Sequence, residues 1–324
     1  MYARGRAGSA RTRGRAHRAG DKAVSARYYA GWDGGGTKTT VALADECGQV
    51  FATRTFGPLN ANGNAPDCVA STVQSCLQFM ADDGRGLEGC IRLVIGMAGV
   101  SSQSARDIVA RSLEEAGWRG EARLVGDHEI TLAGALVGHG AVLIAGTGSV
   151  LLMRDRDGRT RRAGGCGHLI DDGGSGYAIG RDMLAAVVRA RDGRAAPTCL
   201  DDMVAEKLGT ADILSWLYAR ERDKRDVAAL APLLEGALAA GDAAAKAIAL
   251  RAVDELETLV LTGPRDGELA FSGGVLRRGS PIRTMLEERL REKLPGLDIH
   301  DPIASPAEGA VRMAIEPEKG GKQP

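Results

Sequence analysis

Long hydrophobic runs are missing from this sequence of 324 residues, and aromatic residues make up only 4% of it. No stretch approaches the roughly 18–20 consecutive apolar residues that a membrane-spanning helix requires. Hydrophobic residues still account for 44% of the chain and charged residues for 26%, so a core can form and wholesale disorder is excluded. We therefore expect a globular protein with no membrane partner and, from its length, two domains.

An excess of charge of one sign is also missing, because 42 basic residues are balanced by 42 acidic ones. Residues 1–27 nevertheless hold seven Arg and one Lys against one Asp. The rest of the chain is mildly acidic, which argues against a nucleic-acid partner. We assign 1–27 to a disordered basic tail outside the fold. Three origins of this segment are open: a basic arm of the protein, a transit peptide, or a start codon assigned too far upstream. The last is favoured because strand signals begin only at Tyr28.

The cysteines are few and form neither a Cys-X-X-Cys pair nor a regular framework. Such a set is typical of reduced thiols in the cytoplasm rather than of disulfides or a structural zinc site. No segment has the apolar core of a secretion signal. We therefore expect a cytoplasmic protein without a cysteine-based metal site.

Short strands and two helices are predicted for the first half of the folded chain. The first three strands are joined by connections short enough to require antiparallel hairpins. The helices are predicted from apolar residues that recur on one face. The predicted order up to residue 126 is β-β-β-α-β-α-β. Strands are expected at 28–32, 39–44, 50–55, 92–96 and 122–125, and helices at 67–81 and 104–116.

The second half begins in the same way, with a strand, a glycine loop and a strand, followed by a hairpin that turns at Asp157-Gly158. Helical patterns then dominate from 177 to about 261. The repeated opening indicates an internal duplication of the β-β-β-α-β-α-β unit. Strands are expected at 141–145, 150–154, before Gly164, at 269–272 and at 298–300, and helices at 280–294 and 306–314.

A glycine-rich loop, Asp33-Gly34-Gly35-Gly36-Thr37-Lys38-Thr39, joins the first two predicted strands. It is not a P-loop, which has a different spacing and is followed by a helix. Glycines let several backbone N–H groups converge on an anion, whereas a plain turn, the alternative, gains nothing from three of them. Asp33 at the strand end can hold Mg²⁺ beside a triphosphate. The predicted phosphate-binding residues are Gly34, Gly35, Gly36, Thr37 and Lys38.

Two more glycine loops occur in the second half. Ala145-Gly146-Thr147-Gly148-Ser149 lies at the equivalent point of the repeated unit, so the two loops are predicted to form two halves of one phosphate clamp. Leu269–Val275 runs from a strand into paired glycines, where a flat heterocycle can lie against the backbone; a plain turn before a helix is the alternative. The predicted nucleotide-binding residues are Gly146, Thr147, Gly148, Gly273 and Gly274.

Taken in order, DGGGTKT, AGTGS and FSGGV resemble the motifs of the acetate and sugar kinase/heat-shock/actin superfamily. More narrowly, GGCGHLIDDGGSGYAIG at 164–180 is similar to the BadF/BadG/BcrA/BcrD-type ATPase family, which includes N-acetylglucosamine and glucosamine kinases. The resemblance covers about residues 28–315. It implies an α/β fold of two actin-like (ribonuclease H-like) lobes around an ATP cleft.

This resemblance also implies a division of the chain. An N-terminal actin-like lobe is expected at 28–137 and a C-terminal actin-like lobe at 138–305, with a helical insert at 177–261. The final helix, 306–315, is a candidate to return to the first lobe, and 316–324 is expected to be a frayed tail. A homodimer formed through the helical insert is a further expectation that comes from the resemblance alone.

The resemblance assigns a catalytic role to Asp127, which matches the general base of the kinases in the family. The residue pattern is compatible with this role, because an Asp at a strand end and helix N-cap has a fixed direction and can accept the proton of a sugar hydroxyl. An ordinary N-cap Asp is the alternative. His128 and Glu129 are expected to belong to the first helical turn rather than to a metal site.

Sugar-binding residues follow from the same resemblance. Asn60 matches the sugar-binding Asn that follows the third strand in the family, and Asn62 and Asn64 are the alternatives if the register shifts. An amide suits sugar hydroxyls because it both donates and accepts hydrogen bonds. Gly165 and Asp172 match sugar-binding positions of the amino-sugar kinases. Thr147 and Ser149 can reach either sugar or phosphate. The predicted substrate-binding residues are therefore Asn60, Ser149, Gly165 and Asp172.

Two positions depart from the family pattern. Cys166 stands where the family often has Trp, and Gly173 where it often has Glu. A stacking surface and a contact to the hexosamine are thereby lost, which affects the sugar prediction and not the ATPase prediction. We expect Cys166 to be a buried packing cysteine rather than a reactive thiol, and Asp171 to face solvent.

The function that the resemblance implies is phosphorylation of an amino sugar, N-acetylglucosamine or glucosamine, at its 6-hydroxyl, with ATP and Mg²⁺ as cofactors. The alternatives are a kinase of another hexose, an ATPase that activates a radical acyl-CoA dehydratase, and a nucleotide-binding regulator. The activator needs two cysteines near the second phosphate loop, and only Cys166 and Cys199 follow that loop. No DNA-binding helix pair precedes the fold, which argues against a DNA-binding regulator.

Overall fold

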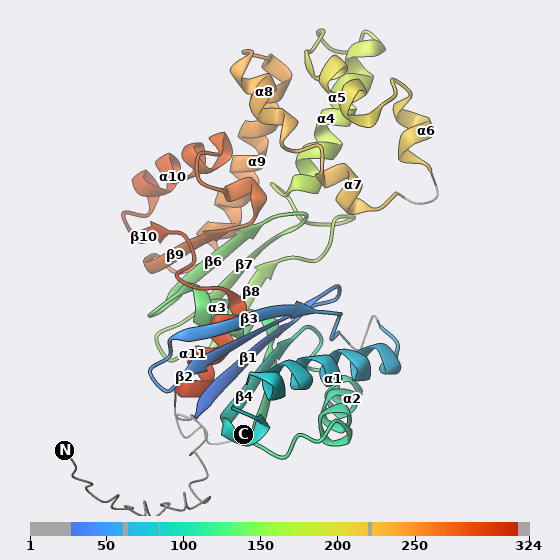
Figure 1. Cartoon of the computed structure of the whole chain (residues 1–324). Coiled ribbons are helices and arrows are strands. Elements are labelled where there is room, and N and C mark those ends of the chain that lie inside the picture. The colour runs from blue at the N-terminus through green and yellow to red at the C-terminus, as the bar shows by residue number, and fades with distance from the viewer. Residues whose placement is uncertain (1–26, 61–63, 84, 220–221, 317–324) are drawn as a thin grey trace, which may run out of the picture.

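The computed structural model describes residues 27–60, 64–83, 85–219 and 222–316, which form two five-stranded sheets and the helices around them (Figure 1). The predictions for the basic tail up to residue 26, for Asn62 and for 317–324 lie outside the described residues. Within the described ranges, no helix combines the length and the apolar character needed to cross a membrane.

The first sheet has the strand order β3-β2-β1-β4-β5. Strand β2 pairs antiparallel with β1 and β3, which confirms the two predicted hairpins, whereas β1, β4 and β5 are parallel to one another. Helical connections link the parallel strands, as such pairs require. The elements of this half are β1 (Tyr28–Gly34), β2 (Thr39–Asp45), β3 (Val50–Phe56), α1 (Pro66–Asp82), η1 (Leu87–Gly89), β4 (Cys90–Met97), α2 (Gln103–Glu115), β5 (Ala122–Gly126) and α3 (Asp127–Ala135).

The second sheet repeats the first, because its order β8-β7-β6-β9-β10 has the same connectivity and the same parallel and antiparallel pairs. The predicted duplication and the two-lobed α/β fold are therefore confirmed. The strands are β6 (Gly140–Ala145), β7 (Ser149–Arg154), β8 (Thr160–Gly164), β9 (Asp266–Ser272) and β10 (Gly296–His300). The helices are α4 (Gly176–Arg191), α5 (Leu200–Leu208), α6 (Ile213–Leu217), α7 (Lys224–Ala228), α8 (Leu233–Ala239), α9 (Ala243–Leu261), η2 (Gly274–Leu276), α10 (Pro281–Lys293) and α11 (Pro306–Ile315).

Each sheet is covered on both faces, and the last helix of each half covers the sheet of the other half. In the first sheet, Tyr28 and Trp32 pack in the core beneath α1 and α2, whereas Ala42 packs against α11. In the second sheet, Leu143 faces the helices of the insert and Val142 faces α3. Helices α3 and α11 therefore lie between the sheets (Figure 1). The predicted domain boundaries remain predictions, but α11 packs on the first sheet.

Glycines make this exchange of helices sterically feasible. A Cβ added at Gly309 of α11 would lie 2.0 Å from the carbonyl oxygen of Ile130 in α3, and one added at Gly134 would lie 2.4 Å from that of Ser305. On the first sheet, a Cβ at Gly31 would lie 2.3 Å from the carbonyl oxygen of Ala307. Real atoms do not approach so closely, so a side chain at these positions would force α11 away from both of its partners.

We expect Gly309→Ala to destabilise the protein by about 2–3 kcal/mol, because the added methyl group meets backbone atoms of α3 that cannot move aside. The measurement is the midpoint of urea unfolding. Gly236→Ala in α8 is the matched control, since its Cβ meets only the flexible end of Met203 and gains about 1 kcal/mol of helix propensity. Equal midpoints for the two variants would contradict the tight crossing.

Candidate active site

The first glycine loop is a tight connection between β1 and β2. The Gly35 N–H donates to the Lys38 carbonyl at 2.9 Å, so this amide is used inside the hairpin. The Gly35 carbonyl accepts from the N–H of Asn60 at 3.3 Å, and the Asn64 side chain donates to the Gly36 carbonyl at 3.4 Å. The exposed part of the loop is Gly36 to Lys38, and both Asn candidates among the described residues lie beside it.

Two carboxylates stand at the same edge of the first sheet. Strands β1, β4 and β5 are parallel and in register, so Asp33 near the end of β1 stands at the same edge as Asp127, which directly follows β5, with β4 between them. Burial of Asp33 and the charge of Asp127 raise the pKa of Asp33, while Lys38 acts in the opposite direction. Both carboxylates therefore belong to one electrostatic site.

Asp127 is the first residue of α3 and not its N-cap, which corrects the prediction: Gly126 occupies the cap position. The Gly126 N–H donates to the Glu129 side chain at 2.8 Å. The Asp127 Oδ1 atom accepts from the N–H of the next residue, His128, at 2.8 Å. His128 and Glu129 thus lie in the first helical turn, as expected. The Asp127 side chain is 54% exposed, so it is accessible to a substrate.

The second glycine loop, between β6 and β7, is held by the start of α4. The N–H of Gly176 donates to the Gly146 carbonyl at 2.7 Å, and the N–H of Tyr177 donates to the Thr147 carbonyl at 3.3 Å. Ser175 caps α4, since its side chain accepts from the N–H of Ala178. The first turn of α4 therefore fixes the loop in position through two of its carbonyl groups.

Three of the predicted sugar-binding residues meet just beyond this loop, on β7 and the segment after β8. Asp172 is buried, and its Oδ1 atom accepts from the Ser149 N–H at 3.2 Å. Its φ of 64° is the one left-handed non-glycine conformation among the described residues, a conformation that Asp tolerates better than most residues do. The Ser149 hydroxyl donates to the Gly173 carbonyl at 2.7 Å, and Gly165 lies against Val150.

Two expectations for this segment are wrong. Cys166 is exposed rather than buried, because it lies in a surface turn between Gly165 and Gly167, both with positive φ. Asp171 is half-buried, and its carboxylate accepts from the Cys166 N–H at 3.0 Å, so it stabilises the turn instead of only facing solvent. Gly173 is the position where the family often has Glu. A Cβ at Gly173 would lie 2.6 Å from the carboxylate of Glu255, so a side chain from α9 already occupies the space beside it.

The third glycine loop follows β9 and touches the second. Gly273 has a φ of 94°, and a Cβ there would lie 2.4 Å from the Ala145 carbonyl oxygen and 2.9 Å from the Gly146 nitrogen. Only glycine permits this approach. Gly274, by contrast, has open space around its Cα. The structure therefore brings the second and third loops together, as two loops that bind one nucleotide would require.

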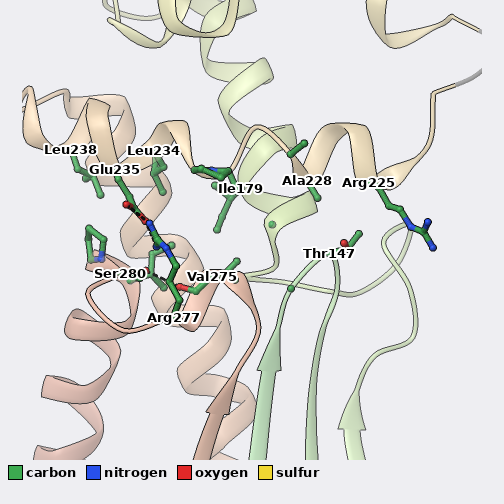
Figure 2. Close-up of a pocket in the computed structure, with 18 residues that line it drawn as sticks. Thr147, Ile179, Arg225, Ala228, Leu234, Glu235, Leu238, Val275, Arg277 and Ser280 are labelled. Atoms are coloured by element: carbon green, nitrogen blue, oxygen red, sulfur yellow. Dashed lines mark hydrogen bonds and ion pairs between the residues drawn. The ribbon is translucent and has the colours of Figure 1, made fainter. Parts of the chain in front are cut away.

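A pocket of about 490 Å³ opens where these two loops meet the helical insert (Figure 2). At its far end, two Arg277 nitrogens bind the two carboxylate oxygens of Glu235, one of them at 2.6 Å, and this hydrogen bonding lowers the pKa of Glu235. Apolar side chains form most of the wall. The lining residues are Gly146, Thr147, Gly176, Ile179, Arg225, Ala228, Ala229, Ala231, Pro232, Leu234, Glu235, Leu238, Gly274, Val275, Arg277, Ser280, Pro281 and Ile282.

The pocket contains only some of the predicted residues. Gly146, Thr147 and Gly274 line it, whereas the first loop, Asp33, Asn60 and Asp127 belong to the first half of the chain. The clamp formed by the first two loops remains a prediction. Sequence reasoning missed the pocket walls contributed by α4, α7 and α8. Their apolar spacing is that of any buried helix face, so no sequence signal separates pocket wall from core.

Two duplicated lobes with exchanged helices and glycine hairpins at equivalent strand ends define an actin-like ATPase fold. The BadF/BadG/BcrA/BcrD ATPase family matches residues 30–314 of the sequence, and the chain belongs to this family. The match includes all the predicted site residues.

Similar proteins carry sugar-kinase names. An N-acetylmuramic acid/N-acetylglucosamine kinase of Clostridium acetobutylicum is 32% identical over 71% of this chain and 77% of its own length. An N-acetyl-D-glucosamine kinase of Dictyostelium discoideum is 27% identical over 91% of this chain and 100% of its own length. The solved structure of a candidate N-acetylglucosamine kinase from Chromobacterium violaceum has a TM-score of 0.70 at 25% identity, covering 90% of this chain and 100% of that one.

We expect Asp33→Asn to raise the melting temperature at pH 7 by about 2–4 °C. The pKa of Asp33 is raised in the folded state, so the folded protein loses stability as pH rises from the ordinary value of 3.8 through the raised value, and the loss is complete above it. Asn at this position does not ionise and so avoids the loss. The difference between variant and wild type should therefore shrink toward pH 4.

The measurement is thermal unfolding from pH 4 to pH 8 without added metal. Asp107→Asn is the control, because Asp107 lies on α2 of the same half, on the exposed surface. A variant that is no more stable than the wild type at pH 7, or whose advantage does not depend on pH, would contradict the electrostatic strain at Asp33.

Proposed function

We propose that this protein is a sugar kinase that transfers the γ-phosphoryl group of ATP to the 6-hydroxyl of an amino sugar, N-acetylglucosamine or glucosamine. The observation that carries the proposal is the contact between the second and third glycine loops at one end of an apolar pocket, in a chain of an ATPase family. The names of the similar proteins support the amino-sugar substrate. The position of the phosphorylated hydroxyl rests on the family resemblance alone.

The nucleotide would bind with its base between the apolar walls and its phosphates at the second loop. A volume of about 490 Å³ lies within the range of small-molecule sites, and apolar walls with a few polar groups suit a purine. Thr147 and the backbone of Gly146 lie at the end of the pocket next to the first turn of α4, whose N-terminus favours negative charge.

Mg²⁺ fits the pair of carboxylates at the edge of the first sheet. Asp33 is a half-buried carboxylate whose pKa is raised partly by Asp127, and a divalent cation beside it would relieve both burial and repulsion. Among the described residues, no group of three or more His, Cys, Asp and Glu side chains could hold a metal. One or two carboxylates completed by phosphate oxygens and water are the usual Mg²⁺ environment in kinases, where the ion neutralises charge on the phosphates.

Asp127 would act as the general base. Its carboxylate is exposed at the start of α3, with a direction set by the hydrogen bond from the His128 N–H. From this position it can accept the proton of the attacking hydroxyl while Lys38 and the loop amides stabilise the transferring group.

The sugar would bind between the two halves of the chain. Asn60 lies beside the first loop, and Asp172 and Gly165 lie beside the second. Amide and carboxylate groups suit hydroxyls because they accept hydrogen bonds in fixed directions. The Ser149 hydroxyl is buried and donates to the Gly173 carbonyl, so its contribution in this proposal is to hold the segment that carries Asp172.

We expect Asp127→Asn to abolish phosphoryl transfer and to leave ATP binding nearly intact, because the amide retains the shape of the side chain but cannot accept the proton. Turnover should fall by a factor of about 100 or more. ADP release measures turnover, and calorimetry measures ATP affinity. Asp107→Asn serves again as the control. If the Asp127 variant kept more than about a tenth of wild-type turnover, the assignment of the base would be wrong.

The substrate is tested by ADP release with Mg²⁺-ATP against a panel of sugars: N-acetylglucosamine, glucosamine, N-acetylmannosamine, glucose and anhydro-N-acetylmuramic acid. We expect stimulation by N-acetylglucosamine or glucosamine, with NMR of the product showing phosphate on the 6-oxygen. Stimulation only by another sugar of the panel would identify that sugar as the substrate, in place of N-acetylglucosamine and glucosamine. ATP hydrolysis that is indifferent to every sugar would overturn the kinase proposal.

A further inference from the structure

Two arginines, Arg225 and Arg277, line the pocket proposed for the nucleotide. They differ in whether a carboxylate neutralises their charge. Both oxygens of Glu235 bind the guanidinium of Arg277, so the charge of that arginine is neutralised at close range. For Arg225, no hydrogen bond or ion pair within residues 27–60, 64–83, 85–219 and 222–316 involves the guanidinium, and the residue is exposed. As far as the described ranges extend, the pocket therefore has one arginine whose charge is neutralised by a carboxylate and one without such a partner.

The two arginines also lie at opposite ends of the pocket. Figure 2 shows Arg225 at the end where Thr147 of the second glycine loop lies, and the Glu235–Arg277 pair at the other end, beside Leu238. Apolar side chains such as Ile179 line the wall in between. A nucleotide with its base between these walls and its phosphates at Thr147 would extend its phosphate chain toward Arg225.

Helix α4 holds Arg225 in this position relative to the loop. The first turn of α4 donates two backbone hydrogen bonds to the Gly146 and Thr147 carbonyls. One turn further along, α4 is in contact with α7, the helix that carries Arg225: a Cβ at Gly180 would lie 2.1 Å from the Val227 carbonyl oxygen. The loop and α7 are therefore docked on neighbouring turns of the same rigid helix.

We propose that Arg225 binds the phosphate chain of the nucleotide. This inference rests on the proposed use of ATP and adds a binding residue that the helical insert supplies from outside the glycine motifs. A guanidinium suits the role because it is always charged and presents several N–H donors in one plane to phosphate oxygens. In the proposed orientation the base and the ribose would lie away from Arg225, so the contribution of Arg225 to affinity should grow with the number of phosphates on the nucleotide.

The experiment measures the affinities of adenosine, AMP, ADP and ATP for the wild type and for Arg225→Gln by calorimetry. We expect the affinity of the variant for ATP to fall about tenfold and its affinity for ADP to fall by a smaller factor. The affinities for adenosine and AMP should change by less than about twofold. Arg225→Lys should recover part of the loss because it restores the charge. Raising the salt concentration should narrow the gap between variant and wild type.

Lys224→Gln is the matched control, because Lys224 precedes Arg225 on the same helix and is exposed, but does not line the pocket. It should leave all four affinities unchanged. Glu235→Gln provides the contrast at the other end, where any loss should be equal for adenosine and ATP. A loss at Arg225→Gln that is equal for all four ligands, or matched by Lys224→Gln, overturns the inference.

Failure of the inference can be distinguished from failure of the proposed function. If the wild type binds ATP and Arg225→Gln binds it equally well, the inference is wrong and the kinase proposal is untouched. If the wild type binds none of the four ligands, both are wrong. A far-UV circular dichroism melt of each variant excludes unfolding as the cause of lost binding.

Discussion

Helices α3 and α11 cross at a distance that only glycine allows, and much of the molecule depends on this contact. Gly134 and Gly309 lie against the backbone of the opposite helix, and the carbonyl of Gly134 accepts from the N–H of Ala304 at 2.8 Å. Each helix follows the sheet of one half and packs on the sheet of the other. Because α3 begins at Asp127, the helix that joins the two halves also positions the candidate base.

Helix α4 has a comparable role in the second half. Its first turn fixes the second glycine loop, and its next turn supports α7, so the phosphate end of the pocket and the helical insert share one support. The insert, which lies between β8 and β9, thus forms part of the wall of the pocket proposed for the nucleotide. Substitutions inside α4 should shift both the second glycine loop and the pocket wall, since packed interiors transmit strain.

Stability and function make opposite demands at the edge of the first sheet. Burial of Asp33 and the charge of Asp127 at the same sheet edge raise the pKa of Asp33, so ionisation of this carboxylate costs the folded protein stability. A chain selected for stability alone would carry neutral residues there. The cost is understandable if the site exists to hold a cation and to accept a proton, which is the arrangement that the proposed kinase reaction requires.

The sequence by itself determined the strands, the hairpins, the duplicated order and the three glycine loops, because alternation, turn residues and glycine act over a few neighbouring residues. It also placed Asp127 at the start of a helix, although not at the correct cap position. The return of the final helix to the first half was expected from the family resemblance. The packing of α3 on the second sheet, the exposure of Cys166, the contact of Gly273 with Ala145 and the pocket walls from α7 and α8 were decided only by the tertiary structure. The physical reason is that burial and contact between distant residues depend on how elements pack, and an apolar helix face has the same pattern whether it meets a core or a ligand.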